Sequence, residues 1–127
     1  MIINLSNHPK ETWQEKQLQA ARAYGELVDL PFPQLPGIMT GEELEQTATS
    51  LLHRIRKMKP DAVIVMGEFS LVFMLVDALL DEGIPILTAA SERNTVEQKG
   101  PDGTKVKIAR FDFVGFRPYR RLSSRNG

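Results

Sequence analysis

The sequence predicts a three-layer α/β domain, with a mostly parallel sheet of strand order 2-1-3-4 and a C-terminal β-hairpin at the edge of the sheet. The central observation is the apolar run of residues 62–66, which Pro60 introduces and Gly67 closes. A strand that is apolar on both faces belongs inside a parallel sheet, with helices above and below it. The second observation is that strand-like and helix-like segments alternate along the chain, as in a sheet built with right-handed crossovers.

The composition is typical of an ordinary globular protein. A chain of 127 residues can form one domain with its own core, so we expect residues 1–127 to be a single unit whose polar end, residues 120–127, is frayed. Sixteen basic and sixteen acidic residues cancel, so bulk charge gives no argument for nucleic-acid or membrane binding. There is no cysteine, no signal-peptide anatomy and no apolar run long enough to span a bilayer. We therefore expect a cytoplasmic protein without disulfides.

The first predicted elements are a strand over residues 2–5 and a turn over residues 6–9. Thr12 and Glu15 match a capping box, which predicts a helix over residues 12–24. In a capping box, the hydroxyl and the carboxylate each accept a hydrogen bond from an otherwise unpaired N–H of the first turn. The helix is therefore expected to follow the turn closely.

A short second strand is predicted over residues 27–30, and the proline-rich segment 31–37 stops it. Thr40 and Glu43 form another capping-box pattern. Apolar residues then recur at steps of three and four as far as Met58. This is the strongest amphipathic helix pattern in the chain.

Residues 69–80 are apolar almost all round and too long for a strand, so they predict a buried helix that Gly83 ends. A fourth strand is predicted over residues 84–88, and a loop over residues 89–94. The turn-forming residues 100–103 predict the following β-hairpin.

The second half of this hairpin changes its alternation. Val106 and Ile108 share one phase, whereas Phe111 and Phe113 share the other. Either a bulge near residues 109–110 re-aims the strand, or the strand is buried on both faces from there.

The predicted strand order reverses between strands one and three, so a crevice should open beyond their carboxyl ends. Three polar turns are expected to meet there and to bind a ligand. Their candidate residues are Ser6, Asn7 and His8, then Gly67, Glu68, Phe69 and Ser70, and finally Ser91, Glu92 and Arg93.

Each candidate also has an ordinary structural interpretation. The His8 imidazole could bind phosphate or move a proton, or it could simply cap the turn. Ser6 and Asn7 are common turn residues. Glu68 could contact a ribose, or it could be an acidic residue favoured in the first turn of a helix. Arg93 could pair with phosphate, or with the adjacent Glu92 on the surface.

Several classes of site are not supported by the sequence. No glycine-rich nucleotide fingerprint is present, and no set of His, Asp and Glu residues has the spacing of metal ligands. We therefore expect neither a metal nor another cofactor. The helix over residues 69–80 leaves little polar face, so either the hairpin covers its second side or two protomers pack across it. A homodimer is the natural expectation.

The loops over residues 6–9 and 90–93, together with the ending over residues 111–119, resemble the small stand-alone CRISPR-associated proteins related to the CARF domain. These include the ring nucleases of type III systems. The resemblance covers nearly the whole chain in size and element order. It implies a homodimer of Rossmann-like domains that binds cyclic oligoadenylate, with cyclic tetra-adenylate as the expected ring, in a groove across the twofold axis. Some members cleave the ring without metal, by attack of a ribose 2′-hydroxyl on the adjacent phosphate.

Carried onto this chain, the resemblance implies that Asn7, His8, Ser91 and Arg93 embrace the ring. Arg93 and His8 would then be the catalytic residues, and a protein that only sequesters the messenger would look the same. No membrane partner and no nucleic-acid duplex partner is expected. Two other classes stay open, namely a nucleotide or sugar-phosphate enzyme on the same sheet and a protein or RNA interaction module.

Overall fold

The computed structural model describes residues 1–124 and confirms the predicted α/β fold. Five strands form one sheet in the order β2-β1-β3-β4-β5, parallel except for the antiparallel pair of β4 and β5. The strands are β1 (Ile2–Leu5), β2 (Leu27–Asp29), β3 (Ala62–Val65), β4 (Ile86–Lys99) and β5 (Lys105–Pro118). The helices are α1 (Glu15–Arg22), α2 (Gly41–Met58) and α3 (Phe69–Leu79), with short 3₁₀ turns at Lys10–Thr12 and Leu80–Glu82.

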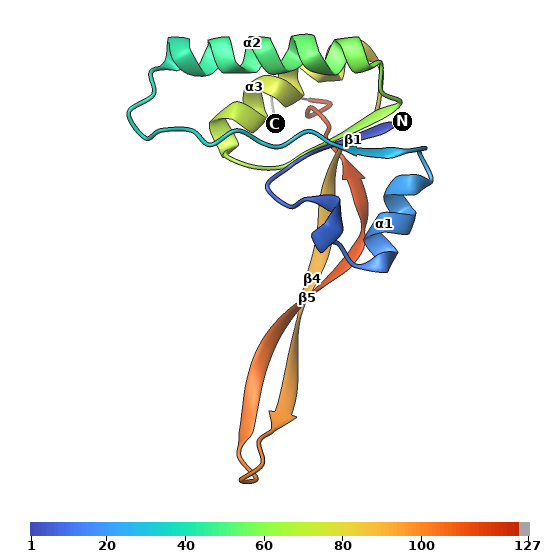
Figure 1. Ribbon diagram of the computed structural model, residues 1–127, viewed down its shortest axis with the longest axis vertical. Coiled ribbons are helices and arrows are strands. Elements are labelled where there is room, and N and C mark those ends of the chain that lie inside the picture. Colours follow the sequence, from blue (N-terminus) through green and yellow to red (C-terminus); the bar gives the residue numbers. More distant parts are fainter. Residues whose placement is uncertain (125–127) are drawn as a thin grey trace.

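The helices lie on both faces of the sheet, which gives three layers. Ile3 and Leu5 of β1 belong to a buried cluster shared with α2 and α3, whereas Ile2 belongs to a second cluster shared with α1. Successive residues of a strand point to opposite faces, so a strand between two layers must be apolar throughout. Figure 1 shows α2 and α3 on one side of the sheet and α1 on the other.

Helix α1 begins later than the sequence predicted. Residues Lys10–Thr12 first form a 3₁₀ turn, and the Thr12 hydroxyl donates to the Pro9 carbonyl instead of capping a helix. The predicted capping box of Thr12 and Glu15 is therefore wrong, and Gln14 precedes the helix without a side-chain cap.

Helix α2 begins as predicted. The Thr40 hydroxyl accepts from the Glu43 N–H, and the Glu43 carboxylate accepts from the Thr40 N–H. The structure therefore confirms this second capping box. The same sequence pattern caps a helix at Thr40 but not at Thr12. Thr12 ends a 3₁₀ turn, and its hydroxyl is already bonded to the Pro9 carbonyl.

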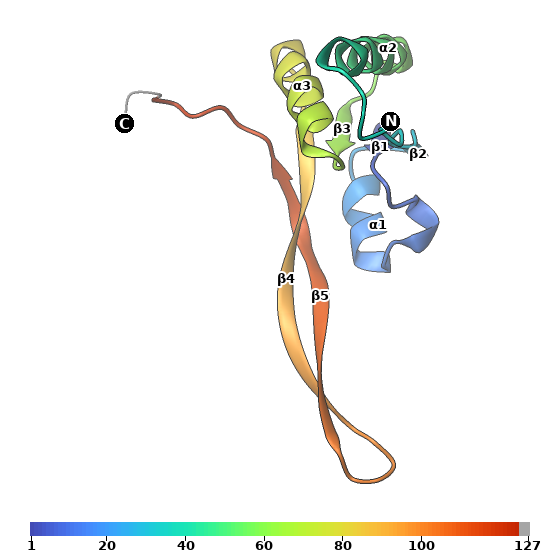
Figure 2. The ribbon, with the colours of Figure 1, turned by 90° about the vertical axis from the view of Figure 1, so that its left-hand side faces the viewer.

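The largest departure from the prediction is β4, which continues from Ile86 to Lys99 as one strand. The predicted loop over residues 89–94 is wrong, because β5 pairs with β4 along the whole stretch from Leu87 to Lys99. β3 pairs only with Ile86 and Leu87, so the rest of β4 and β5 leaves the sheet as a two-stranded ribbon. Both views show this ribbon extending far from α2 and α3 (Figures 1 and 2).

A bulge does exist in the ribbon, but not near residues 109–110. The register shifts between Ala90 and Ser91, which pair with Gly115 and Phe113, so Val114 is the extra residue. Phe111 is 64% exposed, so the alternative of burial on both faces is also wrong. The two apolar phases lie on opposite faces of the ribbon, where Val106, Ile108 and Phe111 are exposed and Phe113, at the base, is buried.

The hairpin does not cover α3. Instead, the segment after β5 runs alongside that helix, where the Tyr119 hydroxyl donates to the Val65 carbonyl over 2.7 Å. Arg121 is hydrogen-bonded to Asp77. The part of the predicted tail at residues 125–127 lies outside the described residues. No helix in the described part of the chain is long and apolar enough to cross a membrane.

Candidate functional site

A crevice of about 290 Å³ opens at the carboxyl ends of β1 and β3, between which the strand order reverses, and beside the first half of β4. Its floor is formed by Ser6, directly after β1, Met66, directly after β3, and Ala89, near the start of β4. The start of α1 and the segment before it form one wall, and the base of the ribbon forms the other. The wall residues are His8, Thr12, Trp13, Gln14 and Gln17 on the first side and Ser91, Phe111 and Phe113 on the second.

A buried polar network fixes the loop that follows β1. Asn4, only 1% exposed, donates to Asp29 Oδ1 over 2.8 Å and to the His8 carbonyl over 2.9 Å. The Ser6 hydroxyl donates to Asn4 Oδ1 over 2.7 Å, and the His8 N–H donates to the Ser6 hydroxyl over 3.2 Å. Buried polar groups are stable only when they are paired, so this network holds the backbone of His8 in one place.

A series of aromatic contacts connects the two walls of the crevice. Trp13 donates its indole N–H to the His8 carbonyl over 2.9 Å, and its ring lies 6.2 Å from that of Phe116. Phe116 in turn makes an edge-to-face contact with Phe113, at 5.0 Å between ring centroids. These contacts lie within the distances at which aromatic pairs attract. The segment that precedes α1 and the base of the ribbon are therefore held together by these aromatic contacts.

The structure brings Ser6, His8 and Ser91 together in the crevice. Arg93 is not in a loop but in the ribbon, directly opposite Phe111. Directly paired residues share one face of an antiparallel ribbon, as do residues two apart along a strand. Arg93 therefore projects from the same face as Ser91 and Phe111, one step farther out.

Glu92 projects from the other face of the ribbon. Its direct partner is Asp112, and it alternates with Ser91 and Arg93 along the strand. The adjacent Glu92 and Arg93 therefore point in opposite directions, which argues against a surface ion pair between them.

Beyond Met66, the turn after β3 does not line the crevice. Glu68 caps α3, because its carboxylate accepts from the Ser70 and Leu71 N–H groups over 3.0 Å each and from the Ser70 hydroxyl over 2.6 Å. The hydrogen bond from the Ser70 hydroxyl, followed by those from the two N–H groups, lowers the pKa of Glu68 below its ordinary value. The carboxylate of Glu68 thus already occupies the place where an anion could have bound at this helix N-terminus.

Two more predicted site residues also lie outside the crevice. Gly67 packs under Phe32, and a Cβ at this position would lie only 2.6 Å from the phenyl ring. The glycine therefore permits close packing here. Asn7 lines a separate hollow of about 170 Å³ near Asp29 and Pro31.

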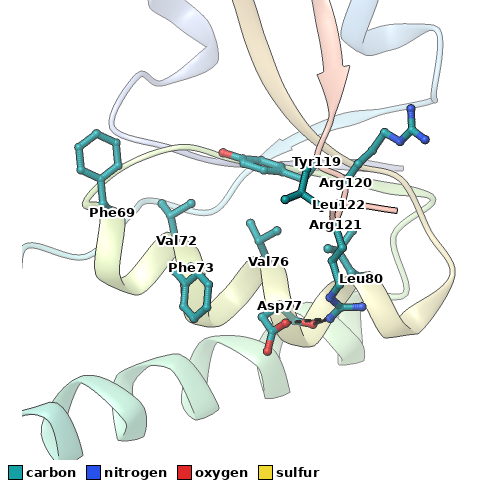
Figure 3. Close-up of a pocket in the computed structure, with 10 residues that line it drawn as sticks. All are labelled: Phe69, Val72, Phe73, Val76, Asp77, Leu80, Tyr119, Arg120, Arg121 and Leu122. Carbon is teal, nitrogen blue, oxygen red and sulfur yellow. Dashed lines mark hydrogen bonds and ion pairs between the residues drawn. The ribbon is translucent and has the colours of Figure 1, made fainter. Parts of the chain in front are cut away.

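Phe69 belongs to a different surface, a groove of about 670 Å³ between α3 and the segment after β5. Figure 3 shows Phe69 and Phe73 projecting from α3, with Arg121 reaching Asp77. Phe69 is 90% exposed and Phe73 is 72% exposed, as is Leu122 at 78%. We call this surface the α3 groove. Its lining residues are Phe69, Val72, Phe73, Val76, Asp77, Leu80, Tyr119, Arg120, Arg121 and Leu122.

Arg121 holds the outer wall of the α3 groove in place. Its guanidinium donates to Asp77 Oδ1 over 2.8 Å, to the Asp77 carbonyl over 2.6 Å and to Asp81 Oδ1 over 3.1 Å. The hydrogen bond to Asp77, followed by that to Asp81, raises the pKa of Arg121. The groove is thus an apolar surface with an anchored charged rim.

Residues 1–117 match the model of the uncharacterized protein MJ1673 family. The chain belongs to that family. The match spans all five strands up to Arg117, and so includes both walls of the crevice and the whole length of the ribbon. No curated protein and no solved structure matches the chain.

Most residues in the walls of the crevice were not predicted from the sequence as site residues. Trp13 and Gln17 fall within the helix predicted over residues 12–24, and Phe111 and Phe113 within the predicted hairpin, but none of the four was predicted to line a site. Asn4 carried the clearest signal, because an amide inside an otherwise apolar buried strand needs a specific partner. Among residues 1–124, no three His, Asp or Glu side chains come together as a metal site would require.

Proposed function

We propose that the protein is a homodimer that binds cyclic oligoadenylate, with cyclic tetra-adenylate as the expected ring, and thereby regulates a type III CRISPR response. The observation that carries the proposal is the crevice, which combines aromatic rings, side-chain amides and hydroxyls at the reversal point of a parallel sheet. The resemblance of the loops and of the ending at residues 111–119 to CARF-related proteins supports the same ligand class.

The lining of the crevice suits adenine. Single-stranded RNA is recognised by aromatic side chains that stack on unpaired bases, together with hydrogen bonds to the base edges. Phe111 offers an exposed ring, and the amides of Gln14 and Gln17 can each donate and accept, as an adenine edge requires. Arg93 lies on the adjoining ribbon face, where its guanidinium can reach a phosphate.

The α3 groove supports the homodimer. Phe69 and Phe73 expose large apolar side chains next to each other on one helix, and such patches mark interaction sites. A second copy is the occupant that would repeat the same patch across a twofold axis. The proposal also requires one ring to contact the crevices of both protomers, which the stoichiometry of ring binding tests.

Cleavage would follow from the same geometry. The 2′-oxygen of a ribose attacks the adjacent phosphorus, the bond from phosphorus to the 5′-oxygen breaks, and the products are a 2′,3′-cyclic phosphate and a 5′-hydroxyl. His8 takes the proton of the 2′-hydroxyl and returns it to the leaving 5′-oxygen, while Arg93 stabilises the charge that develops on the phosphate. Without an in-line 2′-hydroxyl, the same site would only sequester the ring.

Calorimetric titration with cyclic tetra-adenylate and cyclic hexa-adenylate, without added metal, tests the proposal. We expect one ring per two chains, and Arg93→Ala should weaken binding roughly 10–100-fold, because a hydrogen bond to a charged group contributes about 1.5–3 kcal/mol. Arg110→Ala is the matched control, because Arg110 projects from the opposite ribbon face and pairs with Asp112.

Chromatography of the ligand after the titration separates the two modes of regulation. Linear fragments would identify a ring nuclease, whereas a ring recovered intact would identify a buffer or sensor of the messenger. No binding to either ring would contradict the proposal.

A further inference from the structure

The two faces of the ribbon differ in chemistry. The pairs that share the face of the crevice are Ser91 with Phe113, Arg93 with Phe111, Thr95 with Ala109, Glu97 with Lys107 and Lys99 with Lys105. This face carries the cations Arg93, Lys99, Lys105 and Lys107, and Glu97 is its acidic residue. The register is unbroken from Ser91 to Lys99, so the face is continuous as it follows the twist of the ribbon.

The opposite face of the ribbon, which the structure describes in full, carries no unpaired cation. Val96, Val106 and Ile108 lie there. At its base, Asp112 accepts from Asn94 over 2.7 Å and forms an ion pair with Arg110 over 3.0 Å. The one cation of this face, Arg110, is therefore paired within the ribbon, and Glu92 on the same face is acidic.

The cations of the crevice face have no such partner. Within the described part of the chain, no ion pair involves Arg93, Lys99, Lys105 or Lys107. All four side chains are exposed. We call them, with Phe111, the cationic strip. It begins at the crevice and covers the six residue-to-residue steps from Arg93 to Lys99, or roughly 20 Å at the rise of a strand.

We propose that the cationic strip binds the phosphate backbone of a linear single-stranded oligoribonucleotide whose end occupies the crevice. A line of cations that tracks the backbone, next to aromatic rings on which bases stack, is the combination by which proteins bind single strands. Phe111, 64% exposed and directly opposite Arg93, supplies that ring at the point where the strip joins the crevice. The proposal deepens the proposed function. It rests on that function in one respect only, namely that the crevice binds a nucleotide, here at one end of the strand.

Fluorescence anisotropy with linear oligoadenylates of increasing length tests the strip. We expect a labelled dodecanucleotide to bind at least about tenfold more tightly than a tetranucleotide, because only the longer strand reaches the lysines. The triple variant Lys99→Gln, Lys105→Gln and Lys107→Gln should abolish this difference. It should also reduce the salt slope for the dodecanucleotide by about 2, because each neutralised phosphate contributes about 0.7 for a single strand.

A charge-matched control comes from α2 and its end, where Arg54, Lys57 and Lys59 are exposed. Changing these three residues to Gln removes the same charge far from the ribbon and should leave the length dependence intact. An equal loss in this control, or equally tight binding of polyglutamate of similar charge, would show nonspecific anion binding and would overturn the proposal.

The outcomes separate the strip from the proposed function. Ring binding without any length dependence for linear strands would overturn the strip alone. Length-dependent binding of linear strands without ring binding would overturn the cyclic ligand and leave the strip standing. The triple variant should bind the ring as the unchanged protein does, because a ring in the crevice does not reach the lysines.

Discussion

Asn4 is the residue on which the shape of the crevice floor most depends. It is buried in the middle of the sheet and connects Asp29, Ser6 and the carbonyl of His8 by hydrogen bonds. Its side chain thus fixes the loop that carries His8 against the buried strand β1.

Asn4→Ala should therefore lower the free energy of unfolding by about 1–3 kcal/mol, because it leaves buried polar groups unpaired. Urea unfolding of the variant measures this loss. Asn7→Ala is the matched control, because Asn7 is exposed, and a surface change of this kind should stay within about 0.5 kcal/mol. Equal losses in the two variants would show that the network contributes little.

Glu68, in the turn after β3, has a structural role, because its side chain caps the N-terminus of α3. Hydrogen bonds from Ser70 and Leu71 lower its pKa, so its contribution to stability is present above the unfolded-state pKa, near the ordinary value of 4.5. This contribution is lost as the pH falls through the lowered pKa of the folded state.

Glu68→Gln should therefore be less stable than the unchanged protein at neutral pH, and the difference should shrink as the solution becomes more acidic than pH 4.5. Denaturant unfolding of both proteins over a pH series measures the difference. A constant difference across the series would contradict a role for the charged carboxylate.

At the scale of elements, apolar patterning predicts the strands and helices whose side chains pack in the core. Residues 62–66 are recognisable because burial between two layers leaves no room for polar side chains. Residues 69–80 do form a helix, but their predicted burial is wrong on one side, where Phe69 and Phe73 are exposed. Burial gives no such signal in the ribbon. Residues 89–94, of which 91–94 are polar, continue β4 because β5 satisfies their backbone, and nothing in their side chains distinguishes this strand from a loop.

The lack of a burial signal also explains which residues of the candidate site were predicted from the sequence and which were not. Ser6 and His8 were predicted from their position after a buried strand, and the structure places them in the crevice. Trp13, Gln17 and Phe111 were not predicted, because they reach the crevice only through the 3₁₀ turn and the ribbon. Backbone hydrogen bonds close the turn and pair the two strands of the ribbon, and neither element has an apolar pattern that would reveal it in the sequence.

The ribbon should also be separable from the folded core. Its outer residues are exposed, and the pair Thr95 and Ala109 offers a place to close the hairpin early. Replacing residues 96–108 by Asn-Gly, a favoured two-residue hairpin turn, should preserve the fold and ring binding, and it should remove the length dependence for linear strands. Circular dichroism, thermal unfolding and the anisotropy titration measure these three properties. Loss of cooperative unfolding would show that the outer ribbon supports the core.

At the scale of the whole molecule, the crevice and the α3 groove divide the surface into two sites. The crevice opens between α1 and the ribbon, whereas the α3 groove lies between α3 and the segment after β5. In Figure 2 that segment and the ribbon leave the body in different directions. A protomer can therefore contact a second copy through α3 while its ribbon stays accessible.

Phe73→Glu should dissociate this dimer, because it places a charge on an apolar surface that association would bury. We expect sedimentation equilibrium to give a dimer dissociation constant at least about tenfold weaker, equal to about 1.4 kcal/mol. Ile38→Glu is the control, because Ile38 is also a highly exposed apolar residue but lies outside the α3 groove. If the ring spans two crevices, Phe73→Glu should also weaken ring binding although Phe73 lies outside the crevice. Dissociation without any loss of ring affinity would show instead that each crevice binds on its own.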